Sequence, residues 1–147
     1  MSEEVLFSIA NTTALVTWLQ LAALPRQRWV TRMATTAAAA LFAAAYVVLL
    51  ATASAPPEGG FGSLAAVAAL FSVPRILLAG WLHYLAFDLL VGSWEVRDAQ
   101  RRGVPHWLVV PCLVLTFMFG PAGWLAYMAV RTVAARRATR IVPATTT

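Results

Sequence analysis

The stretch AGWLHYLAFDLLVGSWEVRDAQRRGVP, residues 79–105, decides the fold that this sequence predicts. It begins as an apolar, membrane-spanning segment that carries two ionisable side chains, His83 and Asp88, at hydrocarbon depth. A charged carboxylate at that depth costs about 2.5–3.5 kcal/mol on insertion scales, so an aspartate inside a span indicates a functional site. The stretch then becomes polar and ends in RGVP, residues 102–105, which are residue types typical of a helix C-terminus.

The composition of the whole chain also indicates a membrane protein. Of its 147 residues, 61% are hydrophobic and 12% are charged. Soluble domains are typically about 45–50% apolar and about 25% charged. All 11 basic residues are arginines, and they lie where hydrophobic segments end. The net charge of +5 therefore indicates residues that flank a membrane, and no nucleic-acid partner is expected.

Hydropathy predicts an all-α integral membrane protein with one domain, residues 1–137, and a disordered tail, residues 138–147. Four transmembrane helices are expected, at residues 5–24, 33–53, 75–102 and 107–130. Residues 64–73 are apolar but too few to cross, which predicts a short interfacial or re-entrant helix. Pro111 and the GPAG sequence at residues 120–123 interrupt the last segment and are expected to kink it.

Orientation follows from the distribution of arginines. The acidic N-terminus lacks the basic region of a signal peptide, so the first segment is expected to remain in the mature protein. Four spans place both termini on one side, and arginines favour the first and third loops inside by six to five. We therefore expect both termini outside. A re-entrant turn at Gly120 is the alternative, because it would return the arginine-rich tail to the side of these loops.

Two stripes of side chains follow the helix predicted for residues 75–102. At about 100° per residue, one stripe holds Trp81, Tyr84, Asp88, Gly92 and Glu95. The phenol of Tyr84, one turn before Asp88, could donate a hydrogen bond to it. His83 lies on the second stripe, more than a quarter turn away. His83 and Asp88 are thus poorly placed to bond each other, but they could converge on a ligand in a groove beside the helix.

Structural roles are alternatives for these two residues. Asp88 would then pair with a polar residue and lock the helices together, with three candidates: Asn11, Gln20 and Arg75. His83 would hydrogen-bond a carbonyl or hydroxyl group. Arg75, at the start of a helix, would either reach lipid head groups or anchor a ligand. The four spans are expected to form one bundle in which Asn11, His83 and Asp88 point inward.

No cofactor and no metal site are expected. His83 and His106 are the only histidines, and about 18 Å of straight helix separates His83 from the membrane boundary near which His106 begins the last segment. The two cannot easily bracket one haem iron. Neither a phosphate loop, a nucleophile elbow nor a dinucleotide-binding glycine pattern occurs in the sequence.

Two motifs, GWLHYLAFDL at residues 80–89 and LTFMFGPAGWLAY at residues 115–127, carry a family resemblance. With FSIANTTAL at residues 7–15, they make the chain resemble the neoxanthin-synthase-like family over nearly its whole length. These are small four-helix membrane proteins, known in plants as abscisic-acid-deficient-four proteins, with bacterial relatives. The arginine- and alanine-rich composition, without a plastid transit segment, indicates a bacterial member in the inner (plasma) membrane.

The resemblance implies a carotenoid or other isoprenoid lipid as partner. Plant members are linked to the conversion of violaxanthin into neoxanthin, in which a carotenoid epoxide becomes an allenic alcohol without redox change. A proton leaves a polyene carbon and the epoxide oxygen gains one, which requires acid–base groups in a lipid-accessible groove. By this resemblance Asp88 would be the acid and His83 the base, or the reverse. The expected substrate-binding residues are Asn11, Arg75, Trp81, Tyr84 and Glu95.

Three functions stay open on the sequence. The first is an isomerase that acts on a carotenoid or isoprenoid by acid–base chemistry. The second is a non-catalytic protein that binds a carotenoid or other lipid, as a homo-oligomer or beside a partner membrane enzyme. The third is a transporter or proton-handling subunit in which Asp88 titrates, although the inverted repeats of transporters are not evident.

Overall fold

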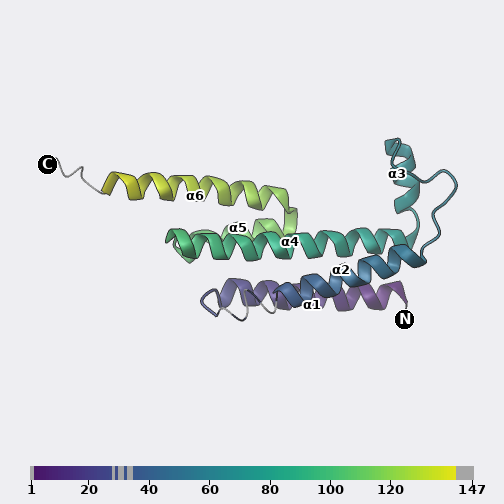
Figure 1. Ribbon diagram of the computed structural model, residues 1–147, viewed down its shortest axis with the longest axis horizontal. Helices are drawn as coiled ribbons and strands as arrows, with labels where there is room; N and C mark the ends of the chain where they lie inside the picture. The colour runs from purple at the N-terminus through teal and green to yellow at the C-terminus, as the bar shows by residue number, and fades with distance from the viewer. Residues whose placement is uncertain (1, 28, 30–31, 33–34, 142–147) are drawn as a thin grey trace.

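The computed structural model describes residues 2–27, 29, 32 and 35–141, with side chains as far as residue 135. The described part of the chain forms helices joined by loops, without strands, as the sequence predicts. Figure 1 shows the helices α1 (Glu3–Ala23), α2 (Thr35–Thr52), α3 (Leu64–Phe71), α4 (Pro74–Arg102), α5 (His106–Phe119) and α6 (Pro121–Ile141).

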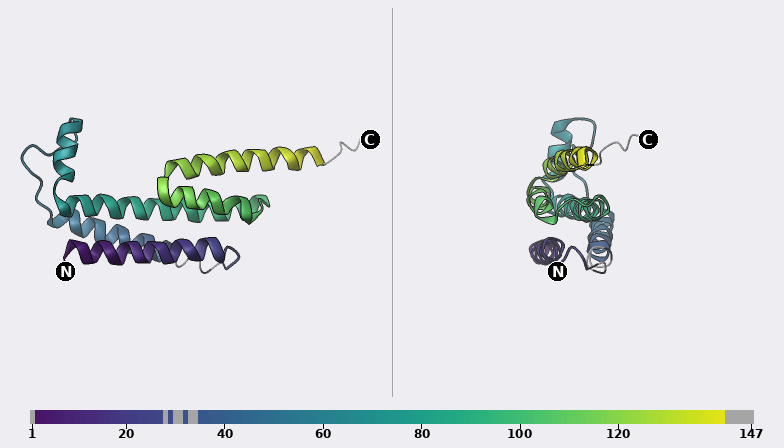
Figure 2. Two further views of the ribbon diagram at one scale, coloured as in Figure 1. Left: turned by 180° about the vertical axis from the view of Figure 1, so that it is seen from behind. Right: turned by 90° about the vertical axis from the view of Figure 1, so that its left-hand side faces the viewer.

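Helix α4 is the centre of the fold, because it contacts each of the other five helices described. In Figures 1 and 2, α1 and α2 run along one side of α4, and the α5–α6 pair lies on the other. Pro74 begins α4 and Gly103 ends it in the left-handed conformation, at φ 66° and ψ 23°, which confirms both expected helix ends. Gly92 faces α1, where an added Cβ atom would overlap the ring of Trp18. Glycine thus lets these two helices approach closely.

Three helices are long and apolar enough to cross a membrane: α1, α2 and α4. This result agrees with the first three expected spans and supports a membrane protein, although residues 33 and 34 of the second span lie outside the described residues. The 29 residues of α4 extend about 44 Å. Asp88 is 14 residues from either end of this helix and therefore lies at its middle.

The last hydrophobic segment is a helical hairpin, so the expected single kinked span at residues 107–130 is wrong. Helix α5 has 14 residues, about 21 Å, which is too short to cross. The chain then reverses at Gly120 and α6 returns beside α5 (Figure 2). Pro121 starts α6 at a position where its missing N–H is not needed. Gly123 has no room for a Cβ atom against Thr116, so glycine allows the two arms to pack closely.

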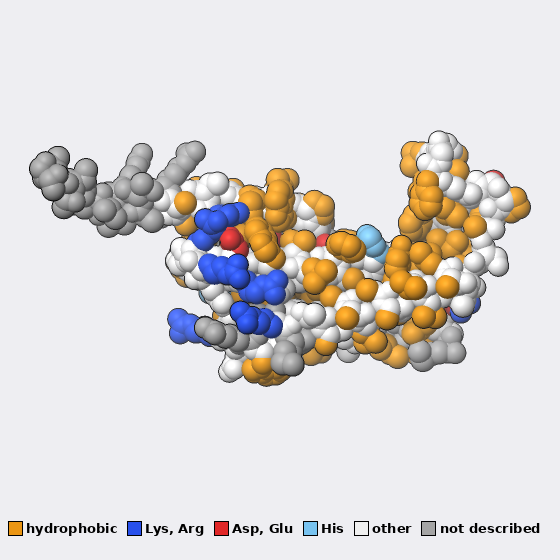
Figure 3. All heavy atoms as spheres, viewed as in Figure 1, with side chains coloured by type: hydrophobic (Ala, Val, Ile, Leu, Met, Phe, Trp, Pro, Cys, Tyr) orange, Lys and Arg blue, Asp and Glu red, His pale blue; other side chains and the backbone are white. Residues whose placement is uncertain are grey.

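The hairpin also changes the expected placement of the termini, because the N-terminus and the end of α6 lie at opposite ends of the molecule (Figure 1). This arrangement disagrees with the prediction that both termini share one side and agrees with the alternative of a turn at Gly120. Basic side chains gather at the end where α4 finishes (Figure 3). The described arginines of this end are Arg26, Arg32, Arg97, Arg101, Arg102 and Arg131. Helix α6 includes residues 138–141 of the expected disordered tail, whose remainder lies outside the described residues.

The expected short helix within residues 64–73 is α3, which stands away from the other helices (Figure 1). The Ser63 hydroxyl caps it by accepting the Ala66 N–H at 3.1 Å. Phe71 at its end packs against Gly80 of α4, where an added Cβ atom would collide with the ring. Between α3 and the turn that joins α5 to α6, Figure 3 shows a broad hollow with hydrophobic side chains along its floor.

Candidate functional site

A pocket of about 350 Å³ lies where the α5–α6 turn meets the middle of α4. The residues that line it are Phe87, Asp88 and Val91 from α4 and Gly120, Pro121 and Trp124 from the turn and α6. Asp88 is the only ionisable residue among them. The pocket is therefore an apolar space with a single carboxyl group, placed beside the middle of α4.

The Asp88 carboxyl group is almost completely buried but is not satisfied by the protein. The residue is 9% exposed, and its Oδ2 atom has no hydrogen-bond partner among the described residues. A buried polar atom without a partner costs about 1–3 kcal/mol, and more when it is charged. Such an atom that also lines a pocket is well placed to meet a polar group of a ligand.

Tyr84 lies beside Asp88, as the shared stripe predicts. Its hydroxyl group donates to the carbonyl oxygen of Phe117 at 3.2 Å and is close enough to the Asp88 carboxylate to interact with it. This bond ties α4 to the end of α5. Tyr84 and Asp88 thus lie close together, as expected. The Tyr84 hydroxyl, however, donates its hydrogen bond to Phe117 of α5 and not to Asp88.

Trp81 and Asn11 are brought together by α1 and α4. The indole Nε1 of Trp81 donates to Oδ1 of Asn11 at 2.9 Å. The Trp81 ring stacks on Tyr84, with centroids 5.4 Å apart, and packs against Phe7 at 5.8 Å. A continuous line of aromatic rings therefore leads along α4 from Phe7 towards Asp88.

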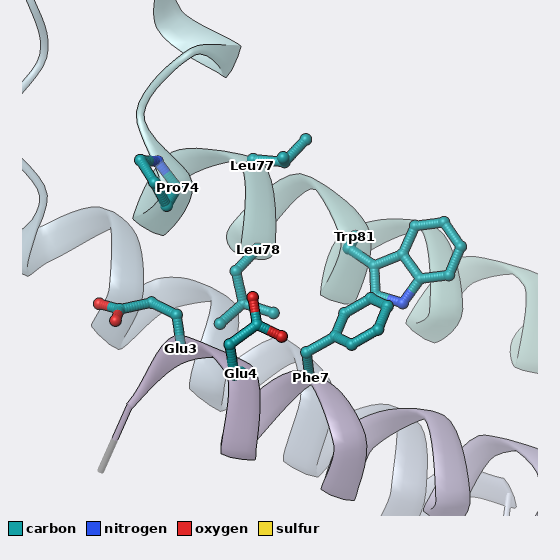
Figure 4. A pocket seen from close by; sticks show the side chains of 7 residues that line it. All are labelled: Glu3, Glu4, Phe7, Pro74, Leu77, Leu78 and Trp81. Atoms are coloured by element: carbon teal, nitrogen blue, oxygen red, sulfur yellow. The ribbon is translucent and has the colours of Figure 1, made fainter.

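A second pocket, of about 280 Å³, opens at the far end of this aromatic line. Its lining residues, drawn in Figure 4, are Glu3, Glu4, Phe7, Pro74, Leu77, Leu78 and Trp81. The rings of Phe7 and Trp81 lie next to each other there, with the Glu4 carboxylate above the same groove. The groove is thus apolar along its length and acidic at one rim.

His83 does not point into the bundle, so that expectation is wrong. The side chain is exposed and lies between aromatic rings, with centroids 4.6 Å from Phe87 and 5.6 Å from Tyr46. Phe87, on which the His83 ring packs, lines the Asp88 pocket. His83 itself is not among the residues that line this pocket.

Two of the expected substrate-binding residues lie away from the pocket. Arg75 pairs with Glu3 at 3.5 Å and lies 13 residues, about 20 Å of helix, from Asp88. Glu95 is fully buried beneath the hairpin, where the Thr116 hydroxyl lies within hydrogen-bond distance of both of its carboxylate oxygens, at 3.1 and 3.2 Å, and of the Cys112 carbonyl oxygen at 3.0 Å. The bundle-locking alternative for Asp88 is also not observed, since no hydrogen bond or ion pair joins Asp88 to Asn11, Gln20 or Arg75.

Sequence reasoning did not assign the part of the site that the hairpin supplies. The GPAG interruption indicated irregular backbone, but it was expected to kink a continuing helix. Gly120, Pro121 and Trp124 therefore had no predicted contact with Asp88. Gly120 adopts a positive φ of 49°, which favours glycine. The glycine at position 120 is therefore the feature of the sequence that permits the reversal.

The comparisons with known proteins identify a family. The family model described as ABA DEFICIENT 4-like matches residues 5–127, most of the chain, including all the residues of the Asp88 pocket. Among curated proteins and among solved structures, no significant match was found. The chain belongs to the ABA DEFICIENT 4-like family.

Proposed function

We propose that this protein has a role related to neoxanthin synthesis and isomerises a carotenoid or related isoprenoid by acid–base chemistry at Asp88. The observation that carries the proposal is an almost completely buried carboxyl group with one unpartnered oxygen in an apolar pocket. Family membership supports the class of substrate. Apolar surroundings exclude water and leave a carboxyl group able to exchange a proton with a bound ligand.

For a carotenoid epoxide, the reaction conserves all atoms and electrons. A base removes a proton from the polyene carbon next to the ring, and the electron pair of that C–H bond forms the new double bond of the allene. The epoxide C–O bond at the ring carbon attached to the polyene breaks, and the oxygen takes a proton to become a hydroxyl group. In our assignment the Asp88 carboxyl donates that proton, and His83, across Phe87, is the base.

Aromatic side chains provide the surface for the rest of the substrate. Phe7, Trp81 and Tyr84 form a continuous ring line that ends beside Asp88, and Trp81 is 39% exposed. A long conjugated molecule could lie along this line and stack on it, with one end group in the groove near Glu4. The reacting end would then reach the Asp88 pocket from the lipid side.

Non-catalytic binding is the second candidate function. The specific observation in its favour is that His83 is exposed and does not line the Asp88 pocket, while the groove beside Trp81 is apolar and large enough for a ring. In that case the protein would hold a carotenoid or other lipid, as a homo-oligomer or for a partner membrane enzyme.

Pigment analysis tests the proposal. The protein is produced in cells that make a carotenoid epoxide such as violaxanthin, and pigments are extracted with and without it. Glu58→Gln, which replaces an exposed loop carboxylate with an amide, is the matched control for Asp88→Asn. We expect a new pigment of unchanged mass with wild type and with Glu58→Gln. Co-purification of unchanged pigment would favour the second candidate. The absence of both a new pigment and a co-purified pigment would contradict both candidates.

A further inference from the structure

A third pocket, of about 330 Å³, lies where the ends of α1 and α4 meet the start of α5. Pro25 and Arg26, which follow α1, line one side of it, and Pro105 and His106 line another. The last two turns of α4 and the residues after them complete the lining: Val96, Ala99, Gln100, Gly103 and Val104. None of these residues lines the Asp88 pocket, so the proposed function does not use this part of the molecule.

Hydrogen bonds between the three segments give this pocket its shape. The Nε2 atom of His106 lies 2.8 Å from the carbonyl oxygen of Ala22, which can only accept, so the ring donates to α1. The side-chain amide of Gln100 donates to the carbonyl oxygen of Pro25. The start of α5 and the end of α4 are thus both tied to the end of α1, and the pocket exists without a ligand.

The pocket has an apolar inner wall and a polar rim. Val96, Ala99 and Val104 are buried, whereas Arg26 and Gln100 are exposed. No aspartate or glutamate is found among the described residues that line it. Of the two N–H groups of the Gln100 amide, one serves Pro25 and the second is available. A ligand in the pocket therefore meets a guanidinium group and an amide donor without a competing carboxylate.

The surroundings of the pocket carry a surplus of positive charge, visible as the group of arginines in Figure 3. Glu95, in the same part of α4, is buried beneath the hairpin. Asp98 already pairs with Arg102 at 3.0 Å and with Arg131 at 3.2 Å. Within the described part of the chain, the other arginines of this end form no ion pair: Arg26, Arg32, Arg97 and Arg101. This surplus favours a partner with negative charge.

The position of the pocket selects the kind of anion. Helices α1 and α4 are both long and apolar enough to cross a membrane, and the pocket lies where both of them end. Arginine and tryptophan at the ends of spans are typical of the lipid headgroup region. Two neighbours in the chain of lining residues, Leu24 and Trp107, are 40% and 72% exposed. They offer apolar surface to acyl chains, which a free phosphate ion lacks.

We propose that this pocket binds the headgroup of an anionic phospholipid, with its phosphate group held by Arg26 and Gln100. A guanidinium group can donate two parallel N–H bonds to a phosphate, which a lysine cannot. Basic pockets between transmembrane helices hold anionic headgroups in this way. A zwitterionic headgroup would place its own cation among the arginines, so like-charge repulsion disfavours it.

Native mass spectrometry of the full-length protein tests the site. The protein is stripped of lipid in detergent and titrated with phosphatidylglycerol or phosphatidylcholine of identical acyl chains. We expect wild type to retain phosphatidylglycerol about fivefold or more tightly than phosphatidylcholine, the effect of roughly one arginine contact near an anionic surface. Since the lipid binds the folded protein, phosphatidylglycerol should also raise the melting temperature more than phosphatidylcholine does.

Variants at two arginines separate a built pocket from diffuse surface charge. Arg26→Gln removes the guanidinium group of the rim and should weaken phosphatidylglycerol binding about fivefold, with phosphatidylcholine binding unchanged. Arg26→Lys keeps the charge and should retain part of the preference. Arg101→Gln removes the same charge at the same end of the molecule but outside the pocket lining, and it should bind both lipids as wild type does. Arg26 and Arg101 are both exposed, so these variants are expected to fold.

Equal binding of the two lipids by wild type would overturn the site, and so would a loss in Arg101→Gln as large as that in Arg26→Gln. Glycerol 3-phosphate carries the same phosphate group without acyl chains. At equal concentration it should not displace phosphatidylglycerol, and displacement would overturn the lipid assignment in favour of a free anion. Pigment conversion plays no part in these measurements, so this proposal and the proposed function can fail separately.

Discussion

A Cβ atom added to Gly120 would lie 3.1 Å from Oδ1 of Asp88 and 3.4 Å from Oδ2. Glycine is thus the residue that lets the α5–α6 turn close over the carboxyl group. The same residue holds φ at 49° and ψ at −102°, a conformation that other residues rarely adopt. One residue therefore both reverses the chain and shapes the pocket.

Gly120→Ala should damage stability and pocket together. The strained backbone is expected to cost about 1–3 kcal/mol, and the methyl group would crowd the Asp88 carboxyl. Gly103→Ala is the matched control, because Gly103 also has a positive φ, 66°, but open space around its Cβ position. Both variants should melt at lower temperature in detergent, and only Gly120→Ala should also lose pigment conversion or binding. Equal pigment function in the two variants would contradict a pocket at this turn.

Thr116→Val should lower the stability of the protein, because the Thr116 hydroxyl is the hydrogen-bond partner of the buried Glu95. Valine keeps the shape but removes the hydroxyl donor, which leaves the acid without that hydrogen bond and should cost about 1–3 kcal/mol. Thr52→Val is the control, because the Thr52 hydroxyl is exposed and bonds the Val48 carbonyl of its own helix at 2.7 Å. Thermal unfolding in detergent measures both. If Thr52→Val is as destabilising as Thr116→Val, the hydrogen bond between Thr116 and Glu95 stabilises the fold no more than an exposed one does.

The arginine-rich end should face the cytoplasm of the producing cell, since positive charge is retained on that side. Single cysteines introduced as Ser2→Cys or Thr132→Cys, with Cys112→Ser to remove the native thiol, report the two ends. In intact cells, a membrane-impermeant thiol reagent should label the first and not the second. Labelling of both from the same side would contradict the hairpin, which places them at opposite ends.

The features that sequence predicts correctly are local ones. The lengths of the α1, α2 and α4 segments follow from hydropathy, and Pro74 and Gly103 limit α4 through their own backbone preferences. The ion pair of Asp98 with Arg102, at 3.0 Å, is local in the same way, because residues four apart are neighbours on one face of a helix. Each of these depends on residues within a few turns of one another.

The features that sequence does not predict depend on how separate segments pack. Helical periodicity places Asp88 and His83 on different stripes but does not predict which stripe another helix packs against. The hairpin packs against Asp88 and Glu95 and α1 packs against Trp81 and Gly92 of the same stripe. His83 lies exposed between Tyr46 and Phe87. Whether the break at Gly120 kinks or reverses the chain likewise depends on packing between the two arms, which meet closely where Gly123 lies against Thr116.

The most direct test of the central claim is pigment conversion by Asp88→Asn. Asparagine keeps the size and much of the hydrogen bonding of aspartate but cannot donate an acidic proton near neutral pH. The variant should insert and melt like wild type, yet lose conversion by about 10²-fold or more, the usual effect of removing a positioned acid or base. Conversion is measured as product formed per amount of folded protein, beside the detergent melting temperature. An Asp88→Asn protein with full conversion would contradict acid–base chemistry at this pocket.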